Sequence, residues 1–299
     1  IGESETFQPG LKIVQDNMGS VFAESDGAII LPEEKSGLHT RVFVNSEGLP
    51  TYEAKDLGVI WLETQDFTYD KRIIMTGSEQ KQYMQVVFAA QLLIDPELGA
   101  KQHSLSNGTV KFGDGKKMSS RLGNVTRATD VLPAAKEAIK AKSPELQEQI
   151  ALGAVKYTFL KSSIGGDIAF DLEQSVSTEG NSGPYLQYAL VRARSILRKV
   201  AAGEPQPAHP VADLEQPERT LADWLGRYPE VLQQSIDGSS LHDLCAYLYE
   251  LSQVFNRFYE QCKVVDDPRS GIRAPLVHQY ERVLCDGLQT LGIPTPEEM

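Results

Sequence analysis

The spacing of apolar residues changes near residue 130, and this change constrains the fold more than any other feature of the chain. Beyond it, apolar side chains recur every three or four residues almost to the end, as in DVLPAAKEAIKAK (130–142) and SLHDLCAYLYELSQVFNRFYEQC (240–262). Such spacing is typical of amphipathic helices. The Pro-rich segment 203–218 interrupts the run and is predicted to link two helices. We therefore expect an all-α helical bundle over residues 131–299.

Before residue 130, strand-like and helix-like stretches alternate. KRIIMTG (71–77) is a short apolar run that ends at glycine, and SEQKQYMQVVFAAQLLI (78–94) follows with helical spacing and Ser78 as its predicted N-cap. TYEAKDLGVIWLETQ (51–65) also has helical spacing. A strand, a glycine and a helix in succession are the unit of a doubly wound sheet, whose ligands bind beyond the carboxyl ends of the strands. Residues 1–130 are thus predicted to form an α/β domain.

Composition excludes several classes of protein. The formal net charge of the 299 residues is −12, so a polyanion would have to be met by local basic clusters. The chain has no apolar run long enough to span a membrane, and its first ten residues lack a signal-peptide pattern. Cys245, Cys262 and Cys285 are widely spaced, and the five histidines form no HxxxH or HExxH motif. We therefore expect no metal site and a cytoplasmic, reducing location.

The segment GDGKKMSSRLGNV (113–125) places three basic residues around two serines between glycines. Glycine frees the backbone and serine offers a short donor, while Lys116, Lys117 and Arg121 supply positive charge in an acidic chain. This combination favours a loop that closes over phosphate. The alternative is a solvated basic turn.

Tyr52, Asp56 and Gln80 are candidates for binding a small zwitterion. Tyr52 and Asp56 are four residues apart on one predicted helix, so a phenol and a carboxylate share a face. A carboxylate accepts a planar guanidinium bidentately, and the ring can add a hydrogen bond or a stacked contact. Gln80 follows strand 71–77 at the predicted ligand edge, where its amide can donate and accept. The alternative is a solvated aspartate beside a core tyrosine, with a glutamine that is ordinary in a first helical turn.

Taken together, these motifs resemble one family. The chain is similar to the C-terminal half of class I arginyl-tRNA synthetases over nearly its whole length and in the family's order. The matching text is IGES (1–4), DGAI (26–29), GLPTYEAKDLG (48–58), TGSEQKQYMQ (76–85), KKMSSRLGNV (116–125), IALGAVKY (150–157), EGNSGPYLQYALVRAR (179–194) and GLQTLGIPTPEEM (287–299). KMSSR and GPYLQY are specific signals, whereas DGA alone is not. The implied fold is a partial Rossmann-like nucleotide-binding domain followed by a helical anticodon-binding domain.

The resemblance implies roles in one reaction. KMSSR corresponds to the KMSKS signature of the class, whose loop stabilises the triphosphate of ATP while the carboxylate of arginine attacks the α-phosphate. This correspondence assigns catalysis to Lys117, Ser119, Ser120 and Arg121, and the ATP-phosphate loop to Lys116, Lys117 and Met118. The implied arginine pocket consists of Tyr52, Asp56, Gln80 and Glu3. ATP with Mg²⁺ is the implied substrate complex, and no tightly bound cofactor is expected.

The chain departs from the family pattern at several positions. Ser120 and Arg121 replace the second lysine and the last serine of the signature, so Lys117 is expected to carry most of the phosphate role. Leu122 stands where relatives commonly have lysine, and Tyr83 where they often have histidine. The HxGH motif, which holds ATP and lies upstream in the family, does not occur in these 299 residues, so the chain alone is expected to be inactive.

For the helical half, the resemblance implies a core RNA-reading module from about residue 183. Tyr185, Tyr188 and Arg192 match residues that meet the anticodon loop, and their spacing places them on one helical stripe. Two rings can stack splayed bases, and the arginine can reach a phosphate or a base edge. Met299 matches a C-terminal position in the same region. The alternative for an aromatic stripe is core packing.

The resemblance therefore implies a monomeric ligase that activates L-arginine with ATP and attaches it to tRNA(Arg), with no membrane partner. One alternative is another class I synthetase, such as a cysteinyl enzyme, but the chain has no suitable cysteine cluster for zinc. The other alternative is a non-catalytic tRNA-binding module derived from a synthetase. A HIGH-like motif encoded upstream of Ile1 would favour the enzyme over the module.

Overall fold

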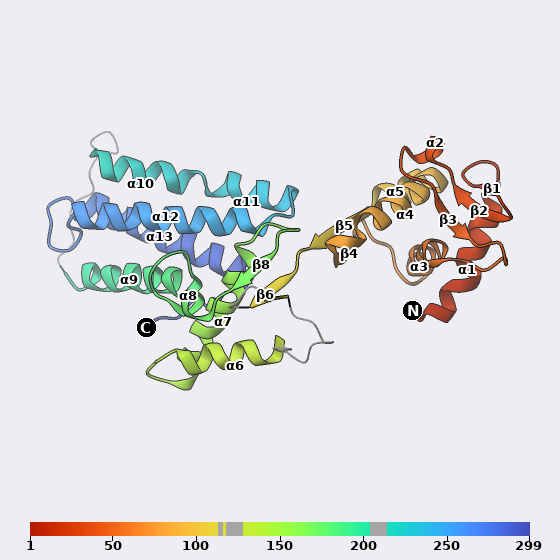
Figure 1. Cartoon of the computed structure of the whole chain (residues 1–299). Helices are drawn as coiled ribbons and strands as arrows, with labels where there is room; N and C mark the ends of the chain where they lie inside the picture. Colours follow the sequence, from red (N-terminus) through yellow and green to blue (C-terminus); the bar gives the residue numbers. More distant parts are fainter. Residues whose placement is uncertain (113–115, 118–127, 204–213) are drawn as a thin grey trace. The chain divides into compact units, whose positions relative to one another are not determined.

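The chain forms two compact units, Ile1–Gly108 and Thr109–Met299, in a computed structural model that describes residues 1–112, 116–117, 128–203 and 214–299 (Figure 1). Each unit is described by itself. Among the helices of these residues, none is long and apolar enough to cross a membrane. The functional boundary expected near residue 130 stays a prediction.

The first unit combines helices with two small sheets. Its elements are α1 (Glu3–Asp16), β1 (Ala23–Ser25), β2 (Ala28–Leu31), α2 (Glu33–Ser36), β3 (Arg41–Val44), α3 (Tyr52–Asp66), β4 (Arg72–Gly77), the 3₁₀ turn η1 (Ser78–Gln80), α4 (Lys81–Ile94), α5 (Pro96–Ala100) and β5 (Gln102–Asn107). Strands β1, β2 and β3 form an antiparallel sheet in that order. β4 pairs with β5 in parallel, from Arg72 opposite Gln102 to Gly77 opposite Asn107. This βαβ arrangement confirms the α/β prediction.

The start of α4 differs from the prediction. The chain first makes the η1 turn, and the α-helix begins at Lys81, so Ser78 is not its N-cap. The physical reason is that in a 3₁₀ turn the backbone N–H of one residue bonds to the carbonyl three residues before it, here Lys81 to Ser78. Such a turn can precede an α-helix without a capping side chain. Gln80 is the last residue of η1 and lies three residues after β4 ends at Gly77.

Helices α1 and α3 pack at very short range. A β-carbon on Gly10 would lie 2.2 Å from the carbonyl oxygen of Ala54, and one on Gly58 would lie 2.5 Å from that of Thr6. Both distances are far inside van der Waals contact, so the crossing needs glycine on both helices. This packing brings the N-terminal turn of α1, with Glu3, beside the first turns of α3.

The second unit is mainly helical and begins with short strands. Its elements are β6 (Val110–Phe112), β7 (Lys116–Lys117), α6 (Ala128–Ala138), α7 (Pro144–Leu160), β8 (Ile168–Phe170), α8 (Leu172–Val176), α9 (Gly183–Ala201), α10 (Gln216–Gly226), α11 (Tyr228–Asp237), α12 (Leu241–Gln261) and α13 (Ser270–Thr290). Helices α9, α12 and α13 pack together, and α10 and α11 pack on α12 (Figure 1). The helical bundle is confirmed, except that β8 is a strand paired in parallel with β6.

A buried network of charges ties α10 to α13. Glu218 is fully buried, and its carboxylate accepts from Arg273 at 2.7 Å and from Arg269 at 2.5 Å. Arg273 also pairs with Glu215 at 2.9 Å and with Asp267 at 3.2 Å. Burial raises the pKa of Glu218, but the hydrogen bonds from the arginines outweigh it and bring the pKa to about 2. The carboxylate is therefore ionised at neutral pH.

Candidate functional site

The predicted phosphate loop is described only at its start. Lys116 and Lys117 form β7, where Lys117 lies opposite Lys111 of β6 and Lys116 opposite Phe112. Met118, Ser119, Ser120 and Arg121 lie outside the described residues. The structure thus gives the backbone register of two residues of this motif, and the roles of all six stay predictions.

A hydrogen bond joins Asp56 and Tyr83 in the first unit. Asp56 lies in α3, one turn after Tyr52, and Tyr83 lies in the first turn of α4. The Tyr83 hydroxyl donates to Oδ2 of Asp56 at 2.5 Å. Burial raises the pKa of Asp56, while this hydrogen bond and the charge of Arg72 lower it. Sequence reasoning noted Tyr83 only as a departure from the family, because its partner is 27 residues away.

Lys55 of α3 contacts both Glu3 of α1 and Tyr52 of its own helix. The ammonium of Lys55 lies 2.6 Å from Oε1 of Glu3 and 5.0 Å from the centre of the Tyr52 ring. Tyr52 is 68% exposed. The Lys55 ammonium, held between a carboxylate and an aromatic face, already contacts two groups that the family resemblance assigns to the arginine pocket. Gln80 is exposed at the carboxyl end of β4.

The other carboxylates around Asp56 have cationic partners. Glu53 pairs with Arg41 at 3.3 Å, and Glu63 pairs with Arg72 at 2.5 Å. Among the residues that the structure describes, Asp56 forms no ion pair and is met only by the neutral phenol of Tyr83. Asp56 is therefore the partly buried carboxylate of this group that has no ion-pair partner among the described residues.

The aromatic stripe of the second unit consists of Tyr185, Tyr188 and Arg192, all in α9. Tyr185 is half-buried, accepts from Nδ2 of Asn256 at 2.8 Å and packs edge-on against Tyr249 at 5.5 Å. Tyr188 is 43% exposed. The two rings therefore face different surroundings, although the sequence placed them on one stripe.

Arg192 lies between two rings and an amide. Its guanidinium carbon is 5.3 Å from the centre of the Tyr188 ring and 6.0 Å from that of Tyr259, and its Nη1 donates to Oδ1 of Asn256 at 3.3 Å. Asn256 and Tyr259 come from α12 and were missed by sequence reasoning. Their spacing of three on one helix was a signal, but only tertiary packing brings them to α9.

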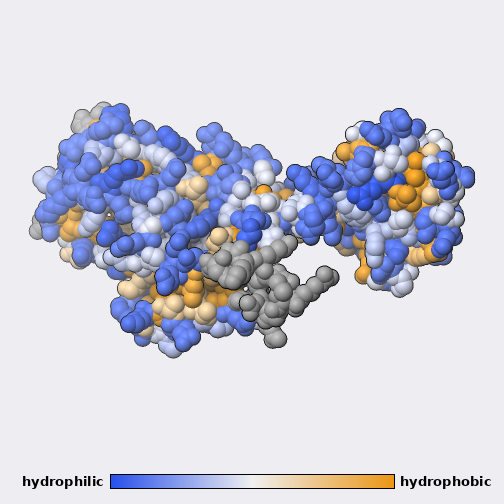
Figure 2. All heavy atoms as spheres, viewed as in Figure 1, coloured by the Kyte–Doolittle hydropathy of each residue, from blue (hydrophilic) through white to orange (hydrophobic). Residues whose placement is uncertain are grey.

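Met299 and Tyr188 line one groove, here called the Met299 groove, with a volume of about 610 Å³. Its apolar lining comes from α6, α7, α8 and α9, and Lys140 and Lys142 lie on it. Figure 2 shows the apolar surface over α6 in orange. Met299 also packs against the small core formed by Ala135, Ile139, Ile150 and Ala151. The structure thus brings Tyr188 and Met299 together.

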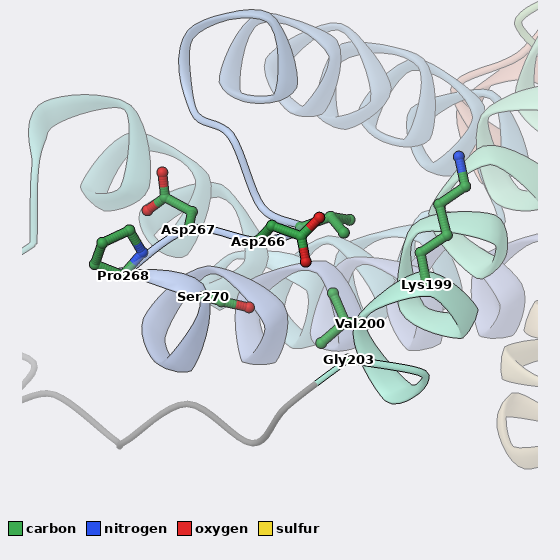
Figure 3. A pocket seen from close by; sticks show the side chains of 8 residues that line it. Lys199, Val200, Gly203, Asp266, Asp267, Pro268 and Ser270 are labelled. Atoms are coloured by element: carbon green, nitrogen blue, oxygen red, sulfur yellow. The ribbon is translucent and has the colours of Figure 1, made fainter.

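A second cavity, of about 450 Å³, lies between the end of α9 and the start of α13 (Figure 3). Asp266, Lys199 and Ser270 line it, and the Lys199 side chain points away from Asp266. No predicted site residue borders this cavity. Outside residues 113–115, 118–127 and 204–213, no cluster of three or more side chains could hold a metal ion.

Both parts of the chain match models of synthetase domains. Residues 1–172 match the family described as "tRNA synthetases class I (R), catalytic domain", and residues 186–299 match the "DALR anticodon binding domain". These are the catalytic and RNA-reading modules of a class I aminoacyl-tRNA synthetase. Because the first match covers more than half of the chain, the chain belongs to the class I arginyl-tRNA synthetase family.

Similar proteins support this assignment. The chain is 30% identical over 320 residues to the arginine–tRNA ligase of Treponema pallidum, with 99% of the chain and 54% of the relative covered. It is also 30% identical over 315 residues to that of Alkaliphilus oremlandii, with 98% and 51% covered. The chain thus spans about half the length of these curated relatives. The Thermus thermophilus arginyl-tRNA synthetase superposes with a TM-score of 0.83 at 26% identity, over 99% of this chain and 58% of that one.

Proposed function

We propose that the protein carrying this chain is an arginine–tRNA ligase. It would activate L-arginine with ATP and Mg²⁺ and attach the arginyl group to tRNA(Arg), as a cytoplasmic monomer. The family supports the class of reaction. The observation that carries the choice of arginine is Asp56, a partly buried carboxylate without a cationic partner among the described residues.

In the proposed amino-acid site, the guanidinium of arginine pairs with Asp56 and lies beside the exposed ring of Tyr52. Gln80, at the carboxyl end of β4, donates to the carboxylate of the substrate or accepts from its amino group. Glu3 can join the guanidinium only if Lys55 releases it, because the two side chains form an ion pair at 2.6 Å. Asp56 is thus the primary selector, and Glu3 has a secondary role.

In the proposed first step, a carboxylate oxygen of arginine attacks the α-phosphorus of ATP. The bond from that phosphorus to the bridging oxygen breaks, and pyrophosphate leaves with the electron pair. Lys117, helped by Lys116 and Arg121, stabilises the charge that grows on the phosphoryl oxygens. A terminal ribose hydroxyl of the tRNA then attacks the carbonyl carbon of the arginyl adenylate and loses its proton, while the bond from that carbon to the phosphate oxygen breaks and AMP leaves with the electron pair.

In the proposed RNA site, Tyr188 stacks an anticodon-loop base that the Met299 groove receives. The groove is apolar and borders an exposed ring, and Lys140 and Lys142 can meet the attached phosphates. Arg192, held beside Tyr188, has N–H groups left for a phosphate or a base edge. Tyr185 supports this surface through Asn256, since its hydroxyl is already bonded there.

The test of the arginine site is Asp56→Asn in the complete protein. Removing one charge of a buried pair costs about 3–5 kcal/mol, so we expect arginine binding measured by calorimetry to weaken at least a hundredfold, with ATP binding little changed. Asp66→Asn is the matched control, because Asp66 is the exposed last residue of the same helix. Unchanged arginine binding in Asp56→Asn would refute the assignment. Binding of tRNA without any binding of arginine by the wild type would favour the non-catalytic module.

A further inference from the structure

Tyr83 occupies a position that the proposed function leaves unexplained. It stands in α4, and its hydroxyl bonds to Oδ2 of Asp56 in α3 at 2.5 Å. That separation is typical of an O–H donor on an ionised carboxylate. The hydrogen bond therefore joins the packed helices α3 and α4, and its acceptor is the carboxylate that would select the substrate.

The charged side chains around this contact form ion pairs with other residues. Arg72 of β4 faces Asp56 but pairs with Glu63 at 2.5 Å. Arg41 of β3 faces Tyr83 but pairs with Glu53, at 3.3 Å. On the α1 side, Glu3 pairs with Lys55. Tyr83 is thus the one hydrogen-bond donor that the described residues supply to the Asp56 side chain.

We propose that Tyr83 is a positioning residue of the arginine site, because its hydroxyl holds one oxygen of Asp56 and leaves the remaining lone pairs of the carboxylate for a guanidinium. A carboxylate has about four lone-pair sites and Tyr83 uses one, so a two-pronged contact remains possible. The role of Tyr83 rests on the proposed function and deepens it. By keeping Asp56 ionised, the Tyr83 hydroxyl lets the site distinguish a charged guanidinium from a neutral ureido group of the same shape.

The electrostatics agree with this geometry. Burial raises the pKa of Asp56, the Tyr83 hydrogen bond and Arg72 lower it, and Glu53 raises it further. Burial and the contact with Asp56 raise the pKa of Tyr83, so the phenol stays protonated and remains a donor at neutral pH. Without that donor, Asp56 would take up a proton at a higher pH. A protonated Asp56 would attract arginine and citrulline, its ureido analogue, by similar hydrogen bonds without the ionic preference.

The experiment compares wild type, Tyr83→Phe and Asp56→Asn in the complete protein. Calorimetry measures the binding of L-arginine and of L-citrulline from acid to neutral pH. In Tyr83→Phe, the pH below which arginine affinity falls should rise by about 1–2 units, because a hydrogen bond to a charged group is lost. The preference for arginine over citrulline should shrink near the new midpoint. Tyr69→Phe is the matched control, since among the described residues the hydroxyl of Tyr69 accepts a hydrogen bond only from the Gln102 amide, at 3.4 Å.

Three outcomes are decisive. A rise of the midpoint in Tyr83→Phe but not in Tyr69→Phe, with the variant still folded and unfolding in one cooperative transition, supports the positioning role. An unchanged pH profile and unchanged citrulline discrimination in Tyr83→Phe, while Asp56→Asn loses arginine, overturns the role of Tyr83 alone. Equal arginine binding by wild type and Asp56→Asn overturns the proposed arginine site and the role of Tyr83 with it.

Discussion

Replacing Asn256 with aspartate should strengthen the second unit and weaken its binding to RNA. Asn256 lies between the two helices of the proposed RNA surface, where it donates to the Tyr185 hydroxyl at 2.8 Å and accepts from Arg192 at 3.3 Å. Aspartate has nearly the same size and keeps both contacts, because the tyrosine hydroxyl can turn to donate. The change therefore adds one negative charge beside Arg192 without opening a cavity.

The expected gain in stability is small. A hydrogen bond to a charged group contributes about 1 kcal/mol more than a neutral one, and partial exposure of both side chains reduces that figure toward the value of surface pairs. For a unit of this size, a gain of up to about 1 kcal/mol raises the melting temperature by about 2–4 °C. The sign of the change in melting temperature distinguishes this contact from ordinary core packing, because a buried charge in an apolar core would lower the melting temperature.

The expected loss of RNA affinity comes from the same ion pair. Arg192 held by a carboxylate no longer neutralises a phosphate, so one counterion fewer is released on binding. The slope of log affinity against log salt should fall in magnitude by about 1, and the affinity should drop severalfold at low salt. A preserved slope would mean that Arg192 does not contact phosphate.

The assay pairs thermal unfolding with a fluorescence titration of tRNA(Arg) over a series of salt concentrations. Asn181→Asp is the matched control, because Asn181 accepts from the Tyr157 hydroxyl at 2.6 Å, and the change adds the same charge at a residue that makes no hydrogen bond to Arg192 among the described residues. The reasoning fails if Asn256→Asp melts at a lower temperature than wild type. It also fails if both variants lose affinity equally, which would indicate a general effect of net charge.

Two further predictions concern the charged groups of the chain. Glu218→Gln should destabilise the protein by about 3–5 kcal/mol at pH 7 in urea unfolding, because Arg269 and Arg273 lose their buried partner. The pKa of Glu218 is lowered from 4.5 to about 2, so its contribution is present above pH 4.5 and is lost as the pH falls through about 2, where variant and wild type should converge. In the complete protein, Lys117→Ala should lower kcat for aminoacylation and leave the KM for arginine nearly unchanged, as expected for a contact made mainly in the transition state. A change confined to that KM would contradict the phosphate role.

The sequence was sufficient for features that depend on local spacing. The βαβ unit around 71–107 and the long helices after residue 130 follow from apolar periodicity, which reports which face of an element is buried. It was insufficient for β8, whose three residues carry no periodicity and pair with β6. The contacts of Lys55 with Glu3 and of Tyr83 with Asp56 join residues 52 and 27 positions apart, and no local pattern encodes such pairs.

The α9 stripe shows where periodicity stops being informative. Tyr185 and Tyr188 differ by one helical turn, and spacing alone gives them the same face. Their neighbours decide otherwise: α12 supplies Asn256 and Tyr249 to the first ring, whereas the second ring borders the Met299 groove and stays 43% exposed. Core packing and RNA contact are thus not exclusive readings of one motif. Tyr185 makes the packing contacts, and in the proposed RNA site these contacts hold in place the helix face on which Tyr188 would meet a base and Arg192 a phosphate.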